Sequence, residues 1–147
     1  LSDINCALGL AQLARIDEIK ARRSRVARWY QEMLADEVRL IVPTTPPGGD
    51  ISWFVFVVRL ADSVGCEHRD RLLEEMRRQK IQVSNYFPPI HLQPFIAERY
   101  GHGPGDFPAC ENAARRTVAL PFHAHLTEDD VAFVCGVLRG ILDTAFR

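Results

Sequence analysis

The chain has 147 residues, of which 47% are hydrophobic and 25% are charged, and its formal net charge is -1. These values are typical of one soluble globular domain with its own core, and they exclude a disordered or fibrous protein. A net charge near zero creates no overall field that would favour nucleic acid or an acidic membrane surface. No apolar run approaches the ~20 residues of a membrane span, so we expect neither nucleic acid nor a membrane as partner.

The cysteines and the first residues bear on the setting of the protein. The four cysteines are widely spaced, without a C-x-x-C pair, which favours a reducing, cytoplasmic environment over a disulfide scaffold or a zinc site. No basic segment precedes the first apolar stretch, so a signal peptide is not predicted. The chain begins with Leu1 in the middle of a pattern, which leaves open a fragment, a truncated gene product or a free-standing protein.

Residues 2–34 are predicted to form one continuous helix, since they contain no proline and only one glycine. Ser2 is a suitable N-cap, and Asp3 suits the first turn. From residue 4 to residue 16 the apolar side chains lie almost all round this helix, which predicts cover on every side. We expect the domain to cover one face and a partner chain or another domain to cover the other. The basic residues at 20–28 are interleaved with acidic ones and are interpreted as a solvated face.

The rest of the chain alternates between predicted strands and helices. After a loop rich in proline and glycine, the aromatic and β-branched residues 53–60 predict a strand. Residues 69–79 predict an amphipathic helix, 81–86 a second strand, 94–100 a short helix, 107–117 another helix and 118–121 a third strand. Thr127, followed by three acidic residues, predicts the capped start of a last helix. We therefore expect one domain over residues 1–147, with a leading helix at 1–35 and a small α/β unit at 36–147.

The loop at residues 85–94 is the best candidate for a functional site. It carries Asn85, Tyr86, His91 and Gln93 on a segment stiffened by prolines, and such a loop presents polar groups at little ordering cost. The alternative is a rigid connector that ends a strand, with His91 satisfied by the backbone. Composition alone favours that alternative.

Other chemical sites find less support in the sequence. His123 and His125 would lie on one side of an extended segment, but no third ligand has a plausible spacing for a metal. There is no G-x-S-x-G nucleophile elbow, and no cysteine has an evident activating context. The residues alone thus predict an α/β domain with one stiff polar loop, and they do not specify a reaction.

Four segments together resemble the C-terminal third of the pyridoxal-phosphate-dependent sugar aminotransferases of the DegT–StrS type. They are residues 1–13 (LSDINCALGLAQL), 81–94 (IQVSNYFPPIHLQP), 105–111 (GDFPACE) and 120–127 (LPFHAHLT). Each segment alone is a weak signal. All four occur in the family's order and at about its spacing, and together they cover essentially the whole chain.

The resemblance implies the small C-terminal domain of a fold-type-I aminotransferase. Its α/β (α+β) fold would have the long N-terminal helix followed by a small, mainly antiparallel three-stranded sheet packed with helices. The whole enzyme would use pyridoxal phosphate to move an amino group from glutamate or glutamine onto a keto-sugar nucleotide. In the family the Schiff-base lysine, the aspartate under the pyridine nitrogen and most phosphate contacts lie upstream. The only lysines here, Lys20 and Lys80, have unsuitable settings, so the resemblance implies no catalytic or cofactor-binding residue and an inactive isolated chain.

A few positions can be carried over from the family. Asn85 and Tyr86 match a pair that is often His-Tyr, at the mouth of the active site near the sugar, and His91 matches a histidine that orders the loop or faces substrate. Family members are homodimers with composite active sites. The expected interface with the missing N-terminal cofactor domain, or with a second copy, consists of Ile4, Leu8, Leu10 and Leu13.

Two alternatives stay open at this point. The chain could be a non-catalytic remnant of an aminotransferase that self-associates or binds a partner through its exposed apolar helix. It could also be a small ligand-binding domain that uses the loop at residues 85–91.

Overall fold

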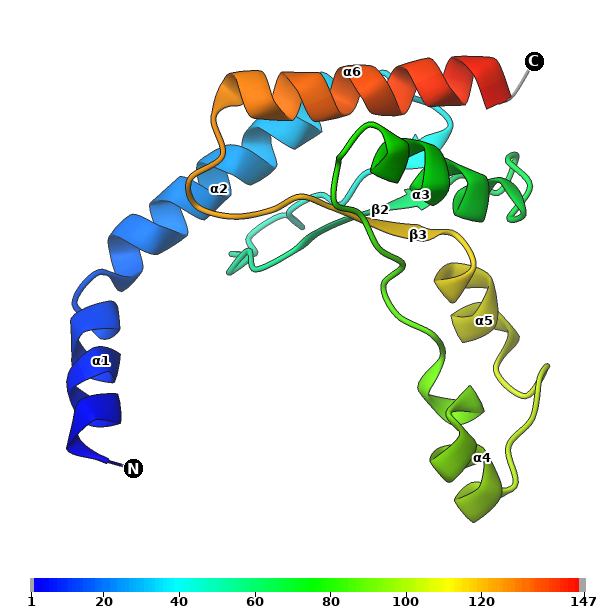
Figure 1. Cartoon of the computed structure of the whole chain (residues 1–147), viewed down its shortest axis with the longest axis horizontal. Helices are drawn as coiled ribbons and strands as arrows, with labels where there is room; N and C mark the ends of the chain where they lie inside the picture. The colour runs from blue at the N-terminus through cyan, green and yellow to red at the C-terminus, as the bar shows by residue number, and fades with distance from the viewer. Residues whose placement is uncertain (1, 146–147) are drawn as a thin grey trace.

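A computed structural model describes residues 2–145 of the chain, which form an arch with two limbs (Figure 1). The described elements are α1 (Asp3–Leu13), α2 (Ile16–Met33), β1 (Leu40–Ile41), β2 (Phe56–Leu60), α3 (His68–Arg78), the 3-10 helix η1 (Ile90–Leu92), α4 (Pro94–Tyr100), α5 (Pro108–Ala114), β3 (Thr117–Leu120) and α6 (Glu128–Ala145). The sheet, α3 and α6 form the crown of the arch. The N-terminal limb consists of α1 and the start of α2, and the second limb consists of η1, α4 and α5.

The three strands form an antiparallel sheet in the order β1-β2-β3, which confirms the predicted fold class. Phe56 pairs with Leu120, and the side chains of Phe56, Val58 and Leu60 are all fully buried. Alternate residues of a strand point to opposite faces, so this spacing places one face of β2 in the core. The predicted strand at 53–60 is therefore confirmed over residues 56–60.

The predicted strand at residues 81–86 is wrong. Only Ser84 pairs with the sheet, through a single bridge to Ala119. The carbonyl of Val83 accepts hydrogen bonds from the guanidinium of Arg77 instead of from a neighbouring strand. The third strand of the sheet is β1, whose two residues pair with the end of β2. The predicted helices at 69–79, 94–100 and 107–117 correspond to α3, α4 and α5.

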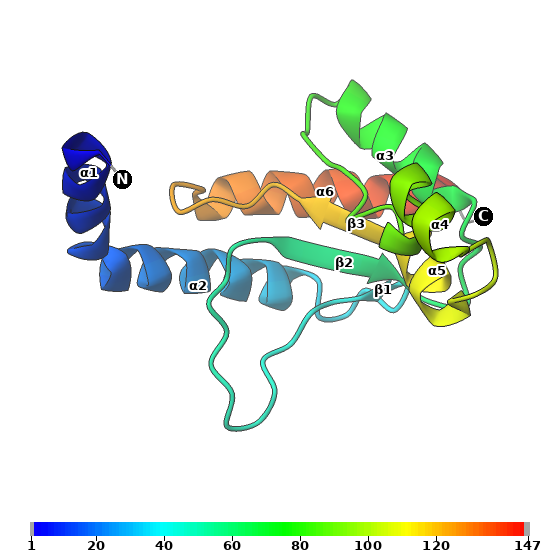
Figure 2. The same cartoon turned by 90° about the horizontal axis from the view of Figure 1, so that it is seen from below.

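The core lies between the sheet and the helices α2, α3 and α6. Helix α6 contacts both α2 and α3, and Figure 2 shows it running alongside α2. The ring of Tyr30 on α2 stacks on Phe56 at 4.8 Å between centroids, and its hydroxyl donates to the carbonyl of Pro121 at 2.8 Å. Thr127 caps α6 as predicted, because its hydroxyl accepts from the N–H of Asp130 while the Asp130 carboxylate accepts from the N–H of Thr127.

The leading helix is broken, so the prediction of one continuous helix is wrong. Helix α1 ends at Leu13 and α2 begins at Ile16, while Arg15 has φ -109° and ψ 9° and its N–H donates to Gln12. Asp17 and Glu18 occupy the first turn of α2, and the Arg15 side chain pairs with Glu18 at 3.2 Å. Negative charge in a first turn stabilises a helix N-terminus, which favours a new helix start here.

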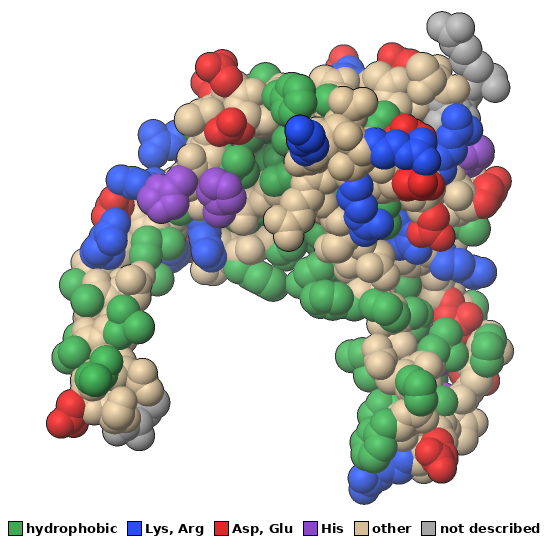
Figure 3. All heavy atoms as spheres, in the orientation of Figure 1, with side chains coloured by type: hydrophobic (Ala, Val, Ile, Leu, Met, Phe, Trp, Pro, Cys, Tyr) green, Lys and Arg blue, Asp and Glu red, His purple; other side chains and the backbone are tan. Residues whose placement is uncertain are grey.

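Helix α1 has no buried side chain at all. Ile4, Leu8, Leu10 and Leu13 expose 81, 60, 69 and 65% of their surfaces. The expectation that the domain covers one face of this segment is thus wrong, whereas cover by another domain or a second copy stays a prediction. Figure 3 shows hydrophobic side chains on both limbs and along the inner margin of the crown. None of the helices within residues 2–145 has the length and hydropathy needed to cross a membrane.

Candidate functional site

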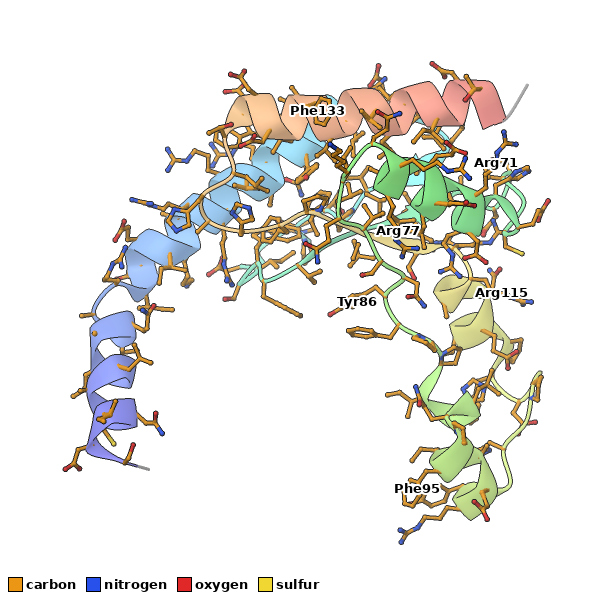
Figure 4. The ribbon with its side chains drawn as sticks, in the orientation of Figure 1. Arg71, Arg77, Tyr86, Phe95, Arg115 and Phe133 are labelled. Atoms are coloured by element: carbon orange, nitrogen blue, oxygen red, sulfur yellow. The ribbon has the colours of Figure 1, made fainter. Side chains whose placement is uncertain are left out.

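The candidate loop at residues 85–94 leads from the crown into the second limb, past Tyr86 and on to α4 (Figure 4). Three contacts hold its first part. Arg77 donates from Nη2 to the Val83 carbonyl at 3.1 Å, and Ala119 donates to the Ser84 carbonyl at 2.8 Å. Thr117 then donates from Oγ1 to the carbonyl of Tyr86 at 3.1 Å. The backbone on both sides of Asn85 is therefore fixed to the sheet and to α3.

Asn85 and Tyr86 are both half-buried, and Figure 4 shows Tyr86 at the inner margin of the arch. The Tyr86 ring stacks on Phe87 at 4.3 Å, and its side chain extends into the hollow between the two limbs in Figure 4. The side-chain amide of Asn85 and the hydroxyl of Tyr86 make no hydrogen bond to another group among residues 2–145. Because these groups project from a fixed backbone and have no partner there, they can bind a polar ligand.

His91 has a different position from the other two predicted site residues. It is only 8% exposed, its Nε2 lies 3.1 Å from Oε1 of Glu111, and its ring centroid lies 4.7 Å from that of Phe107. The interpretation in which the backbone satisfies His91 is therefore wrong, since a carboxylate does so. His91 helps to line an open apolar pocket of about 480 Å³ on the second limb, whereas Tyr86 lines a neighbouring pocket of about 270 Å³ that shares Ile90 and Cys110 with it.

Glu111 is the residue of this site that sequence reasoning missed. Its Oε1 also accepts from the N–H of Gly105 at 2.8 Å and from that of Phe107 at 3.4 Å. The N–H of Gly105, and after it the ring of His91, holds the pKa of the Glu111 carboxyl below its usual value. A glutamate in the first turn of α5, just after a glycine-rich turn, was the available signal, because backbone N–H groups at a helix start attract a carboxylate.

Neither a metal nor pyridoxal phosphate fits the groups at hand. No set of three or more His, Cys, Asp and Glu side chains within the described part of the chain is placed to hold a metal ion. A lysine that forms a Schiff base is activated by an enclosed setting. The side chain of Lys20 is 44% exposed and pairs with Asp50 at 3.7 Å, and Lys80 is exposed just beyond α3. These lysines do not provide a cradle for the cofactor.

Comparison with known proteins gives a consistent result over almost the whole chain. The model of the DegT/DnrJ/EryC1/StrS aminotransferase family matches residues 1–139. The spore coat polysaccharide biosynthesis protein SpsC of Bacillus subtilis is 30% identical over 144 residues, which cover 97% of this chain and 37% of that protein. GDP-perosamine synthase of Caulobacter vibrioides is 33% identical over 148 residues, which cover 97% of this chain and 38% of the enzyme.

A solved structure extends this result to the fold. DesV from S. venezuelae superposes with a TM-score of 0.82 at 30% identity, over 96% of this chain and 36% of DesV. The chain thus spans a little more than a third of the length of the proteins it matches. Taken with the antiparallel sheet and its helices, these matches show that the chain belongs to the DegT/DnrJ/EryC1/StrS aminotransferase family.

Proposed function

We propose that this chain is the small domain of a nucleotide-sugar aminotransferase and that it covers the sugar side of the active site. The observation that carries this proposal is the match to DesV over 96% of this chain but only 36% of DesV. The whole enzyme would move an amino group from glutamate or glutamine to a keto-sugar nucleotide, with pyridoxal phosphate bound by another domain. The names of two relatives, GDP-perosamine synthase and dTDP-4-dehydro-2,3,6-trideoxy-D-glucose 4-aminotransferase, support a nucleotide-linked sugar as the substrate class.

In this proposal Asn85 and Tyr86 contact the sugar. Their backbone is pinned to the sheet through Thr117 and Ser84, so their polar groups are positioned before substrate arrives. His91 orders the loop from behind, because it is buried against Glu111. The side chains of Asn85 and Tyr86 would then orient the sugar, while the cofactor domain would supply the chemistry of amino transfer.

The same proposal assigns a partner to α1. Its four large aliphatic side chains would pack against the N-terminal cofactor domain or against a second copy in a homodimer. Each of these side chains is at least 60% exposed, and covering one of them stabilises a complex by roughly 1–2 kcal/mol. The described cysteines are all free, which supports a cytoplasmic enzyme.

The test uses the full product of the gene. We expect it to bind pyridoxal phosphate and to transfer an amino group from glutamate to a nucleotide-linked keto-sugar. Asn85→Ala and Tyr86→Ala should each raise the KM for the sugar by roughly tenfold, since each removes a polar contact to substrate, while the absorbance of bound cofactor is unchanged. Arg71→Ala, on the outer side of α3 in Figure 4, is the matched control and should leave KM unaltered. A gene product without cofactor binding, or unchanged KM in both variants, would refute the proposal.

The exposure of α1 also supports a second candidate, a non-catalytic module that self-associates through this helix. This candidate requires a gene product without amino transfer and a purified chain whose mass in solution is a multiple of 16.7 kDa. Light scattering of wild type and of a Leu8→Gln, Leu13→Gln variant distinguishes it, because the substitutions should return such a module to a monomer.

A further inference from the structure

One carboxylate oxygen joins two segments of the second limb that are far apart in the sequence. Oε1 of Glu111 contacts Nε2 of His91 at 3.1 Å and accepts from the N–H groups of Gly105 and Phe107. The side chains of His91 and Glu111 are 9% and 13% exposed, so water has little access to the contact. The first segment belongs to the candidate loop, and the second is the glycine-rich turn at residues 101–107.

We propose that Glu111 is a positioning residue for the substrate-side loop, which it holds by fixing His91 as the Nε2–H tautomer and tying it to the turn at residues 101–107. This role in substrate binding rests on the proposed function of the loop. The structural part, the tautomer and the tie, does not depend on any activity.

The tautomer follows from counting donors around the carboxylate. Backbone N–H groups stabilise the ionised form of Glu111, and an ionised carboxylate can only accept hydrogen bonds. Nε2 of His91 must therefore carry the proton that lies between the two side chains. If Nε2 were unprotonated, its lone pair would face a carboxylate oxygen at 3.1 Å in a nearly dry site, which is a repulsive arrangement.

The contact between His91 and Glu111 is important because residues 88–93 of the loop have few other hydrogen bonds to the rest of the domain. Pro88 and Pro89 have no backbone N–H, and the hydrogen bonds of η1, from Leu92 to Pro89 and from Gln93 to Ile90, stay inside the loop itself. The contact of His91 with Glu111 is the polar link from η1 to the turn at residues 101–107 among the described residues. The loop is thus fixed to the sheet at its Tyr86 end and to α5 at its His91 end.

A neighbouring acid provides a matched control. Asp106 accepts from the N–H of Gly103 at 3.0 Å and lies 3.4 Å from His102, so it closes the turn upon itself and does not contact the loop. Asp106→Ala removes a carboxylate from the same turn but leaves the tie to His91 in place. Its effects separate the role of Glu111 from general loosening of the turn.

The experiment compares wild type, Glu111→Ala, Glu111→Gln and Asp106→Ala in the 147-residue chain. In wild type and Asp106→Ala, nitrogen chemical shifts should show His91 as the Nε2–H tautomer. In Glu111→Ala the hydrogen-bonded amides of Leu92 and Gln93 should exchange about tenfold faster or more, because the loop end is released. The amide oxygen of a glutamine can still accept from the backbone N–H groups and from Nε2–H of His91, so Glu111→Gln should keep the Nε2–H tautomer and the slow exchange.

The outcomes separate the two proposals. Unchanged exchange in a folded Glu111→Ala variant, or equal acceleration in Asp106→Ala, would overturn the positioning role. If Glu111→Ala does not fold, loss of the Nε2–H tautomer in Glu111→Gln overturns it instead. In the full gene product, Glu111→Ala should raise the KM for the sugar by roughly tenfold with little change in kcat. A gene product without amino transfer, whose Glu111→Ala variant nevertheless shows the faster exchange, would refute the aminotransferase proposal and leave the contact between Glu111 and His91 standing.

Discussion

Replacing Tyr30 by phenylalanine tests how the crown is held together. The Tyr30 hydroxyl is buried and donates to the Pro121 carbonyl at 2.8 Å, and the described residues offer that carbonyl no other donor. Burial also raises the pKa of Tyr30, so the hydroxyl keeps its proton at any ordinary pH. Tyr30→Phe keeps the ring stacked on Phe56 but removes the hydrogen bond to the carbonyl of the half-buried Pro121, which costs about 0.5–1.5 kcal/mol.

The measurement is urea unfolding followed by tryptophan fluorescence, since Trp53 lies near the stacked pair, with its centroid 5.7 Å from that of Phe56. With a slope of about 1–3 kcal/mol per molar urea for small proteins, the midpoint should fall by roughly 0.5 M. Tyr30→Ala, which also removes the ring, should lose about 3–5 kcal/mol. Tyr100→Phe is the matched control, because Tyr100 is 60% exposed. Equal midpoints for Tyr30→Phe and Tyr100→Phe would refute this account of the core.

Two further predictions concern α1 and the response to acid. The double variant Leu8→Gln, Leu13→Gln should change the free energy of unfolding by no more than about 0.5 kcal/mol, because both side chains are exposed. Leu138→Ala in the core should cost about 2–5 kcal/mol. A loss above about 1 kcal/mol in the double variant would mean that α1 packs on the domain. Hydrogen bonds from Arg39 hold the pKa of the buried Glu37 below its usual value, so the stability that this group provides is present above its unfolded pKa of about 4.3 and is lost as the pH falls through the folded pKa. Unfolding measured from pH 7 to pH 3 should therefore show a smaller acid loss in Glu37→Gln than in wild type, and parallel curves would contradict the assignment.

The elements that could be predicted are those whose signals are local. The aromatic and β-branched run that ends at Leu60 forms β2, and Thr127 with its acidic first turn begins α6. Helix α4 has the predicted bounds, because Pro94 starts it and Gly101, with φ 70°, ends it in the left-handed conformation that glycine favours. In each case residues within one or two turns decide the outcome.

The elements that could not be predicted depend on partners distant in the sequence. Residues 81–86 have a strand-like composition, but Arg77 takes the Val83 carbonyl and leaves one bridge to the sheet. Two-residue β1 is a strand only because Leu60 and Arg59 lie beside it. In the candidate site, the loop and its polar residues were identified from proline and histidine content. The partner of His91 is Glu111, 20 positions away, and no periodic pattern connects them.

The break between α1 and α2, at Ala14 and Arg15, lies at one end of a long helix that leads into the crown. Helix α2 has 18 residues and is thus about 27 Å long at 1.5 Å per residue. A rotation of about 10° at Ala14 and Arg15 therefore moves the far end of α2, and the crown attached to it, by about 5 Å. Since α1 has no buried side chain, such a rotation disturbs no packing inside the domain. If another domain or a second copy held α1, the orientation of the crown relative to it would therefore depend on the backbone torsions of Ala14 and Arg15 alone.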